Sequence, residues 1–237
     1  LSLGKMLLLA ILAGAYIALA GVGATAAAVT VESGSLAKLL SACVFPAGLS
    51  MVILAGSELF TGNCLMVMAL LERRITPAQL LRSWLTVYLG NAVGGAAVAA
   101  LAVYSHTASL FGDGLARSMV SIAESKAALG AGDAFLRGVL CNFLVCLAVW
   151  MAAASKRAEG KVIALFFPIL LFVLCGYEHC IANLYYLPAG AFAAAEYGMK
   201  TTLTLAGCLK NLAAVTLGNL VGGAALGVGY RFAYLKE

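Results

Sequence analysis

Long apolar runs dominate the chain and leave few folds open to it. About six of them reach the roughly 20 residues that a helix needs to cross a bilayer. We place these runs near 5–31, 36–71, 76–104, 133–154, 161–190 and 201–233. Because lipid offers no hydrogen bonds to backbone groups, a spanning segment must be a helix or part of a closed barrel. Runs of this length are typical of helices, so we predict an all-α membrane protein with six transmembrane helices.

The composition agrees with a membrane protein. Of the 237 residues, 63% are hydrophobic and 11% are charged, whereas soluble domains carry about 25% charged residues. The apolar start, Met6 to Val31, is long enough to span and lacks the polar cleavage region of a signal peptide. The seven cysteines form no Cys-x-x-Cys pair, so we expect small apolar residues within helices and neither disulfides nor metal ligands.

Positive residues predict the orientation. One set of ends and loops holds Lys5, Arg73, Arg74, Arg82, Lys156, Arg157, Lys161, Arg231 and Lys236. The opposite loops hold fewer, chiefly Lys38, Arg117, Lys126 and Lys200. This bias places both termini in the cytoplasm of a multi-pass protein in a bacterial-type inner (plasma) membrane, with 105–132 as the main external loop. The net charge of +5 lies mainly in these loops, which argues against nucleic-acid binding.

The two halves of the chain repeat. Residues 87–96 (VYLGNAVGGA) match residues 215–224 (VTLGNLVGGA) at eight of ten positions. We expect this motif to be a small-residue packing face as well. Three spans per unit is an odd number, so the second unit is predicted to be inverted. The chain is then one transmembrane channel domain, 1–237, with inverted repeats about 1–105 and 133–237.

The second and fifth runs are too long for one simple span, and each carries glycine and polar residues inside it. That pattern is typical of broken helices, and a Gly-x-Glu stands in each, at 56–58 and 176–178. In the first break, Ser57, Thr61 and Asn63 either satisfy freed backbone groups or, for Thr61, face a pore. Paired breaks in inverted repeats place a transport site near the midplane, between them.

The second break contains His179, one of only two histidines; the other, His106, lies in a polar connection. Ionisable groups at membrane depth are costly and usually mark a pathway for ions or protons. Imidazole titrates near neutral pH, so His179 is predicted to donate a hydrogen bond or a proton to an anion. The alternative is a buried imidazole bonded to backbone. We expect Glu178, beside it, to accept hydrogen bonds from the broken backbone rather than to relay protons.

Three motifs carry a resemblance to a known family. They are residues 59–63 (LFTGN), 137–150 (RGVLCNFLVCLAVW) and 176–183 (GYEHCIAN). Together they resemble the formate/nitrite transporter family, in order and over essentially the whole chain. The resemblance implies an aquaporin-like fold of six spans and a homopentamer with one pore in each protomer, with no enzyme activity and no cofactor. The family's cytoplasmic N-terminal helix is expected to be absent or truncated.

The resemblance also implies roles for single residues. The family's central histidine matches His179, and the threonine that faces it matches Thr61. Its conserved lysine, at the outer side of the fourth span, matches Lys126, sixteen residues before Asn142. The expected pore and substrate-binding residues are therefore His179, Thr61, Lys126, Asn142 and Glu178. Apolar constrictions are expected at Phe45 and Phe172 toward the outside, at Leu49 and Phe60 toward the cytoplasm, and at Val145.

These roles suggest a mechanism. Apolar constrictions bar hydrated ions, because stripping water from a charge is costly. Lys126 is expected to attract an anion and to raise the basicity of the bound weak acid. His179 and Thr61 would then donate hydrogen bonds or a proton, so that the substrate passes as the neutral acid. Small monovalent anions, protons and the lipid bilayer are thus the expected partners.

Formate is the expected substrate. Residues 182–190 (ANLYYLPAG) resemble formate-type and hydrosulfide-type members more than nitrite-type ones. The segment 61–64 (TGNC) departs from the formate channels, so hydrosulfide is the second candidate and nitrite the third.

Two other classes of protein stay open. One is a membrane enzyme or metal carrier that uses Glu178, His179 and Cys180, with Glu58 as a further ligand, although consecutive residues rarely converge on one ion. The other is a water or neutral-solute channel, which the absence of an Asn-Pro-Ala motif in either break disfavours.

Overall fold

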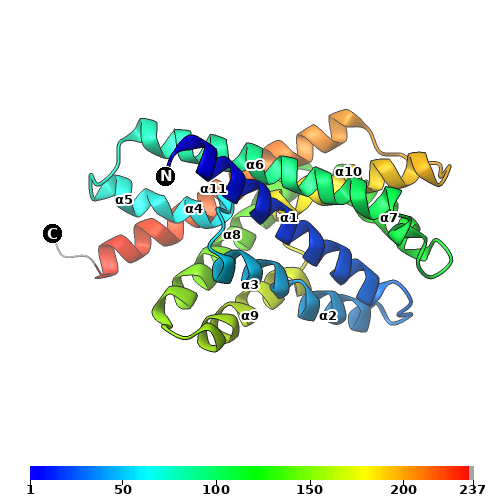
Figure 1. The fold of residues 1–237 in the computed structure, drawn as a ribbon, viewed down its shortest axis with the longest axis horizontal. Coiled ribbons are helices and arrows are strands. Elements are labelled where there is room, and N and C mark those ends of the chain that lie inside the picture. Colours follow the sequence, from blue (N-terminus) through cyan, green and yellow to red (C-terminus); the bar gives the residue numbers. More distant parts are fainter. Residues whose placement is uncertain (235–237) are drawn as a thin grey trace.

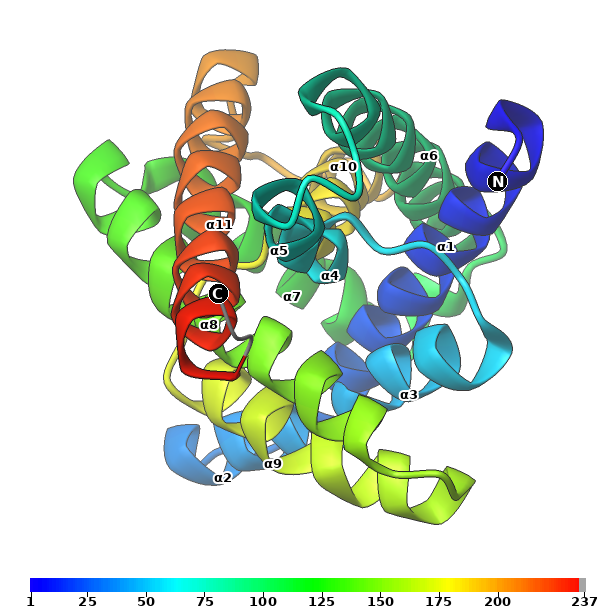
Figure 2. The same ribbon diagram turned by 90° about the vertical axis from the view of Figure 1, so that its left-hand side faces the viewer.

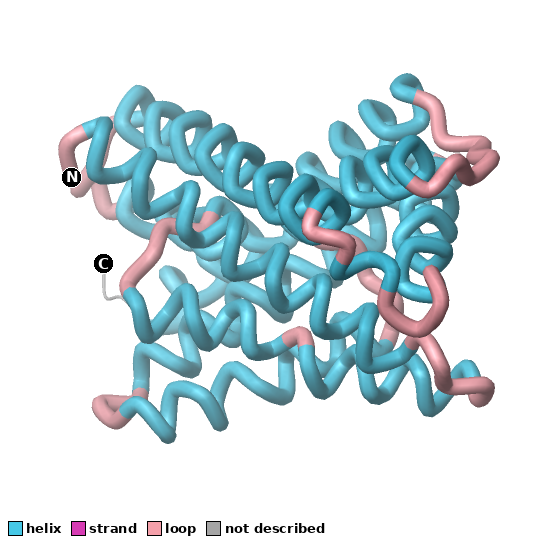
Figure 3. The backbone as a smooth tube through the Cα atoms, turned by 45° about the vertical axis from the view of Figure 1, so that its right-hand side comes forward, coloured by secondary structure: helices cyan, strands magenta, loops and turns pink. Residues whose placement is uncertain are grey.

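Apolar helices joined by short turns form the chain in the computed structural model, which describes residues 1–234. The elements are α1 (Leu3–Ala28), α2 (Gly34–Val44), α3 (Pro46–Ala55), α4 (Phe60–Asn63), η1 (Cys64–Met66), α5 (Val67–Leu71), α6 (Pro77–Tyr104), η2 (Thr107–Ser109), α7 (Gly114–Ala128), α8 (Ala131–Ala154), α9 (Ala158–Leu174), α10 (Cys180–Glu196) and α11 (Leu205–Tyr234). No strand occurs within residues 1–234 (Figure 3). The prediction of an all-α fold is confirmed. Lys236 and the last residues of the predicted repeat 133–237 lie outside the described residues.

The apolar runs coincide with these helices. Five are long and apolar enough to cross a membrane, namely Leu3–Ala28, Gly34–Ala55, Pro77–Tyr104, Ala131–Ala154 and Leu205–Tyr234. The predicted fifth span, 161–190, is divided between α9 and α10, which have 17 residues each. The count of six spans therefore stays a prediction.

Both predicted helix breaks are present. After α3, Gly56 adopts a left-handed conformation (φ 73°) and the chain runs without helix to Phe60. After α9, Gly176 does the same (φ 69°) and helix resumes at Cys180. Glycine suits both positions because it has no Cβ to clash at positive φ. Each break thus interrupts the helix at the same point of a Gly-x-Glu sequence.

Packing between helices follows the repeat. The α1 helix packs along α6, and α8 packs along α11. A Cβ on Gly94 would meet the carbonyl oxygen of Ile11, and a Cβ on Gly222 would meet that of Val139. Gly222 follows Gly94 by 128 positions, and Val139 follows Ile11 by 128, so the same contact recurs in both halves. The repeated motif is therefore a close-packing face, as predicted.

The close contact at Gly222 predicts a large difference between two glycines of α11. We expect Gly222→Ala to lower the melting temperature of the detergent-solubilised protein, because overpacking a helix contact costs about 1–3 kcal/mol. Gly229→Ala is the matched control, since nothing lies within 4 Å of a Cβ built there. Alanine there should hold or raise the melting temperature. Equal melting of the two variants would contradict the packing role of Gly222.

The two ends of the molecule differ in which segments they hold. The start of α1, the end of α11 and the turns 72–76 and 155–157 lie at one end of the long axis (Figure 1). Figure 2 shows α4 near the centre, where it contacts α6, α8 and α11. The first break therefore lies deep in the bundle, next to helices of the other half.

The connection 105–132 is not the simple polar loop that the sequence suggested. It contains α7, whose Leu115, Met119 and Ala123 are buried at four-residue spacing. The helix packs on α10, with Gly190 against Ala123. Small and apolar residues on one face of this segment stabilise a helix by burial, although its composition is polar on average.

Candidate functional site

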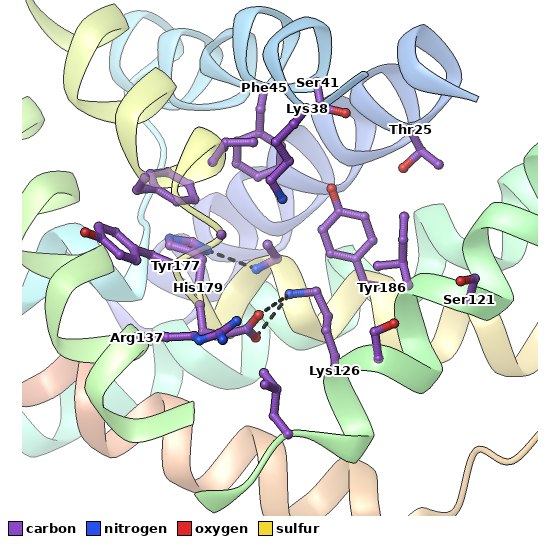
Figure 4. A pocket seen from close by; sticks show the side chains of 18 residues that line it. Thr25, Lys38, Ser41, Phe45, Ser121, Lys126, Arg137, Tyr177, His179 and Tyr186 are labelled. Carbon is purple, nitrogen blue, oxygen red and sulfur yellow. Dashed lines mark hydrogen bonds and ion pairs between the residues drawn. The ribbon is translucent and has the colours of Figure 1, made fainter. Parts of the chain in front are cut away.

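A cavity of about 360 Å³ opens between α2, α7, α8, α9 and α10. Figure 4 shows its lining, with basic side chains reaching in from several helices. The cavity also reaches Phe45, Phe172 and His179, all of which are nearly fully buried. It therefore joins a charged vestibule to the apolar core at the second break.

His179 has both ring nitrogens engaged. It is the N-cap of α10, where its Nδ1 accepts a hydrogen bond from the backbone N–H of Ala182 (3.0 Å). Since Nδ1 accepts, the proton of the neutral ring lies on Nε2. Nε2 is 3.0 Å from Oγ1 of Thr61, so it donates to that hydroxyl. The two breaks thus meet at one hydrogen bond, between a histidine that is 3% exposed and a threonine that is fully buried.

Aromatic rings surround this hydrogen bond. Phe45 and Phe172 pack edge to face with ring centroids 5.7 Å apart. Phe172 in turn stacks on the imidazole of His179, at 5.8 Å. The other predicted constriction residues, Leu49, Phe60 and Val145, are buried in the same hydrophobic core and do not line the cavity.

Glu178 and Lys126 form a buried ion pair. Lys126 Nζ lies 2.9 and 3.1 Å from the two carboxylate oxygens, and Asn183 Nδ2 donates to Oε2 at 2.7 Å (Figure 4). The expectation that Glu178 accepts from broken backbone is wrong. A buried carboxylate needs strong donors, and an ammonium and an amide supply them here. Lys126 lies in the last turn of α7, just before α8 begins at Ala131, and its ammonium is paired with the carboxylate of Glu178.

Hydrogen bonds fix α7, the helix that carries Lys126, to the connection after α10. The backbone N–H of Thr202 donates to Glu124 Oε1 at 2.6 Å, and the hydroxyls of Thr201 and Thr202 donate to the same oxygen. These bonds, the backbone one foremost, hold the pKa of Glu124 below its ordinary value. Glu124 therefore stays ionised at neutral pH and keeps α7 in place.

Two asparagines of the repeated motif hold the breaks. Asn91 Oδ1 accepts from the N–H of Phe60 (3.0 Å), and its Nδ2 donates to the carbonyls of Ala10 and Glu58. Asn219 makes the equivalent bonds in the other half, to the N–H of Cys180 and the carbonyls of Gly138 and Glu178. A single buried amide in each half thus bonds one N–H and one carbonyl oxygen that the broken helix leaves free.

One interpretation of the sequence was that side chains of the first break hydrogen-bond its freed backbone groups. The structure shows other partners for these side chains. Asn63 donates to Glu58 Oε2 at 2.7 Å, and Thr61 bonds His179. Ser57 Oγ has no hydrogen-bond partner in residues 1–234. Asn91 bonds these backbone groups instead, from its position on α6.

Asn142 does not line the cavity. It is fully buried, and its Nδ2 donates to the carbonyl oxygens of Thr61 (3.2 Å) and Asn219 (2.7 Å). Asn142, which lies on α8, thus fixes the backbone at Thr61. The prediction that Asn142 belongs to the site stays a prediction, with a positioning role as the one that its contacts favour.

Two cations of the cavity had no predicted role. Lys38 and Arg137 line it beside Lys126. Lys38, Ser41 and Phe45 lie three and four positions apart and all line the cavity, which is the spacing of one helix face. That spacing was a usable signal in the sequence. Arg137 opens the second family-like motif, but nothing in the sequence showed that it lies near Glu178.

Metal-binding groups are absent from the described part of the chain. No group of three or more His, Cys, Asp or Glu side chains within residues 1–234 lies close enough to hold an ion. Glu178 is instead occupied by Lys126 and Asn183. The donor set that a metal carrier needs is therefore not assembled by these residues.

Comparison with known proteins gives consistent similarities. The family model described as Formate/nitrite transporter matches residues 1–233. A "Probable formate transporter" of Methanothermobacter thermautotrophicus is 39% identical, over 99% of this chain and 90% of that protein. The formate channel FocA of Haemophilus influenzae is also 39% identical, over 93% of this chain and 83% of its own length. A solved structure described as a pentameric formate channel with formate bound superposes with a TM-score of 0.87, at 32% identity, over 99% of this chain and 98% of that one.

Proposed function

Because the chain belongs to the formate/nitrite transporter family, we propose that it conducts formate through a pore that passes His179 and Thr61. The observation that carries this proposal is the 3.0 Å hydrogen bond between the two breaks, placed beside two aromatic rings and below a basic cavity. The formate channels and transporters among its relatives support the choice of substrate. Hydrosulfide and nitrite are the alternatives.

The family consists of membrane channels and transporters of small anions, not enzymes, and this chain is a multi-pass membrane protein. We propose further that it forms a homopentamer with one pore in each protomer, as a relative described as pentameric suggests. The basic residues favour an orientation with both termini in the cytoplasm of a bacterial-type inner membrane. The cavity with Lys126 and Lys38 then faces outward.

The constriction accounts for the exclusion of hydrated ions. Phe45 and Phe172 leave an entering anion no polar group to replace its water, and that loss costs several kcal/mol or more. A weak acid avoids the cost by crossing in its neutral form. The basic cavity collects the anion, and solvent protons reach it there.

His179 then acts as a hydrogen-bond donor to the substrate. Its neutral ring carries the proton on Nε2, and a second proton on Nδ1 would face the N–H of Ala182. Two donors facing each other disfavour the imidazolium, so the geometry favours hydrogen bonding over proton donation by the ring. The hydroxyl hydrogen of Thr61 has no other acceptor within the described residues, and it offers a second donor at the same point.

A flux measurement tests this function. We expect purified protein in liposomes to speed formate uptake, followed by stopped-flow fluorescence of an enclosed pH dye, well above the rate of protein-free vesicles. Nitrite and hydrosulfide are measured in the same vesicles, and formate is expected to be fastest after the protein-free rates are subtracted. Formate uptake equal to that of protein-free vesicles would contradict the proposal. Faster net hydrosulfide uptake would replace formate by the second candidate.

A further inference from the structure

The cavity holds more positive charge than the Lys126–Glu178 pair accounts for. Three cations, Lys38, Lys126 and Arg137, line it together with one carboxylate, Glu178. Lys126 is bonded to that carboxylate, so the pair is neutral as a whole. Neither Lys38 nor Arg137 has an ion-pair partner within residues 1–234. The surplus charge that an entering anion meets therefore comes from these two side chains.

Both cations are placed by the second break. The carbonyl oxygen of Arg137 accepts a hydrogen bond from the N–H of Glu178 (3.3 Å), the residue that directly precedes His179. A Cβ built on Gly176 would lie 4.0 Å from Nζ of Lys38. Figure 4 shows the two side chains on either side of the cavity, with the Lys126 ammonium between them. They flank the route to His179.

The two cations differ in what they recognise. A guanidinium is planar and offers parallel N–H donors that fit the two oxygens of a carboxylate. An ammonium is a point charge with no preference for a planar partner. Formate and nitrite each present two oxygens on one atom, whereas hydrosulfide presents a single sulfur. Arg137 therefore distinguishes between these anions, and Lys38 does not.

We propose that Lys38 and Arg137 form an anion-receiving site on the outer side of the Phe45–Phe172 ring pair, in which Arg137 selects planar two-oxygen anions over hydrosulfide. This proposal rests on the proposed function, because it assumes that the anion then passes between Phe45 and Phe172 toward His179. It adds to that function a residue other than His179, Arg137, that selects the class of anion. Lys38 and Arg137 are both exposed, so salt screens the attraction that their charges contribute.

Substitutions separate charge from shape. Arg137→Lys keeps the charge and removes the paired donors, so net formate and nitrite uptake should fall about tenfold while hydrosulfide changes less than about twofold. Lys38→Gln should lower all three rates by the same factor, and high salt should abolish the difference from the native protein. Lys200→Gln, which removes an exposed cation outside the cavity, should leave all rates as they are. Melting temperature confirms that each variant is folded.

A binding measurement distinguishes failure of this site from failure of the proposed transport function. Isotope-labelled formate is titrated into the detergent-solubilised full chain, and the broadening of its carbon resonance reports binding even if nothing is conducted. We expect broadening by the native protein and by Lys200→Gln, and its loss in Arg137→Lys. Equal broadening by native and Arg137→Lys proteins, or no broadening by the native protein, would overturn the site. Equal loss of all three fluxes in Arg137→Lys would overturn the selectivity.

Discussion

A His179→Asn protein is expected to transport formate about 10- to 100-fold more slowly than the native protein, because a hydrogen bond to a charged or proton-sharing group contributes about 1.5–3 kcal/mol. Asparagine is a good N-cap, so its side-chain oxygen still accepts from the N–H of Ala182. Its shorter side chain does not reach Thr61. The substitution therefore removes the Nε2 donor and keeps the start of α10. The measurement is stopped-flow formate uptake in liposomes.

Two companion variants make this result interpretable. Thr61→Val has nearly the same shape as the native residue and removes only the hydroxyl, so it should lower uptake in the same direction. His179→Ala removes the cap as well, and its melting temperature should fall below that of His179→Asn. Native rates in both His179→Asn and Thr61→Val would contradict a role for this hydrogen bond in transport.

The dependence of uptake on pH distinguishes the two roles considered for His179. If solvent supplies the proton, uptake decreases with rising pH in the native protein and in His179→Asn with the same slope. We expect this outcome, because the N–H of Ala182 already occupies Nδ1 and opposes a second ring proton. A flattened pH dependence in His179→Asn would assign the proton to the imidazole instead.

An Asn219→Leu protein is expected to lose several kcal/mol of stability. Leucine has a similar size but leaves the N–H of Cys180 and the carbonyls of Gly138 and Glu178 without their side-chain partner. Each buried group left unbonded costs about 1–3 kcal/mol. The melting temperature in detergent should fall sharply, together with the yield of folded protein. Leu217→Ala, at a 58% exposed position of the same helix, is the control and should melt close to the native protein.

Asn219→Asp tests whether hydrogen bonding rather than volume is responsible. The carboxylate still accepts from the N–H of Cys180, but it sets an acceptor against two carbonyl oxygens. It should therefore destabilise the protein although its size is unchanged. Asn91→Leu should act like Asn219→Leu, since Asn91 makes the equivalent bonds in the first half. Native melting of Asn219→Leu would contradict the role of this amide in holding the break.

The fold was largely predictable because its causes are local in the sequence. Apolar runs of spanning length predict helices, and the Gly-x-Glu sequences at 56–58 and 176–178 indicate where two of them break. The helix α7 was missed because its buried face, in which small alanines stand between larger residues such as Leu115 and Met119, lies in a segment that is polar on average. Helix count and position follow from composition along the chain, which the bilayer constrains strongly.

The contacts of the site were less predictable, because they join residues far apart. The pair of His179 and Thr61 was expected, and they lie 3.0 Å apart. Glu178 finds its partner 52 positions away, in Lys126. No rule of sequence spacing predicts a contact between residues 52 positions apart, since the contact depends on how α7 packs against α10.

The sequence alone therefore determined the long apolar helices, the two breaks and the polar residues that stand at them. Tertiary structure alone decided which partner each polar group has. It placed the asparagines that hold the breaks and the carboxylate that neutralises Lys126, and it left Lys38 and Arg137 of the cavity without an ion-pair partner among residues 1–234. The physical reason is that burial along a helix is set by the periodicity of its own residues. Hydrogen bonds and ion pairs in an apolar interior depend on which helices come into contact, and only the packed bundle brings those groups together.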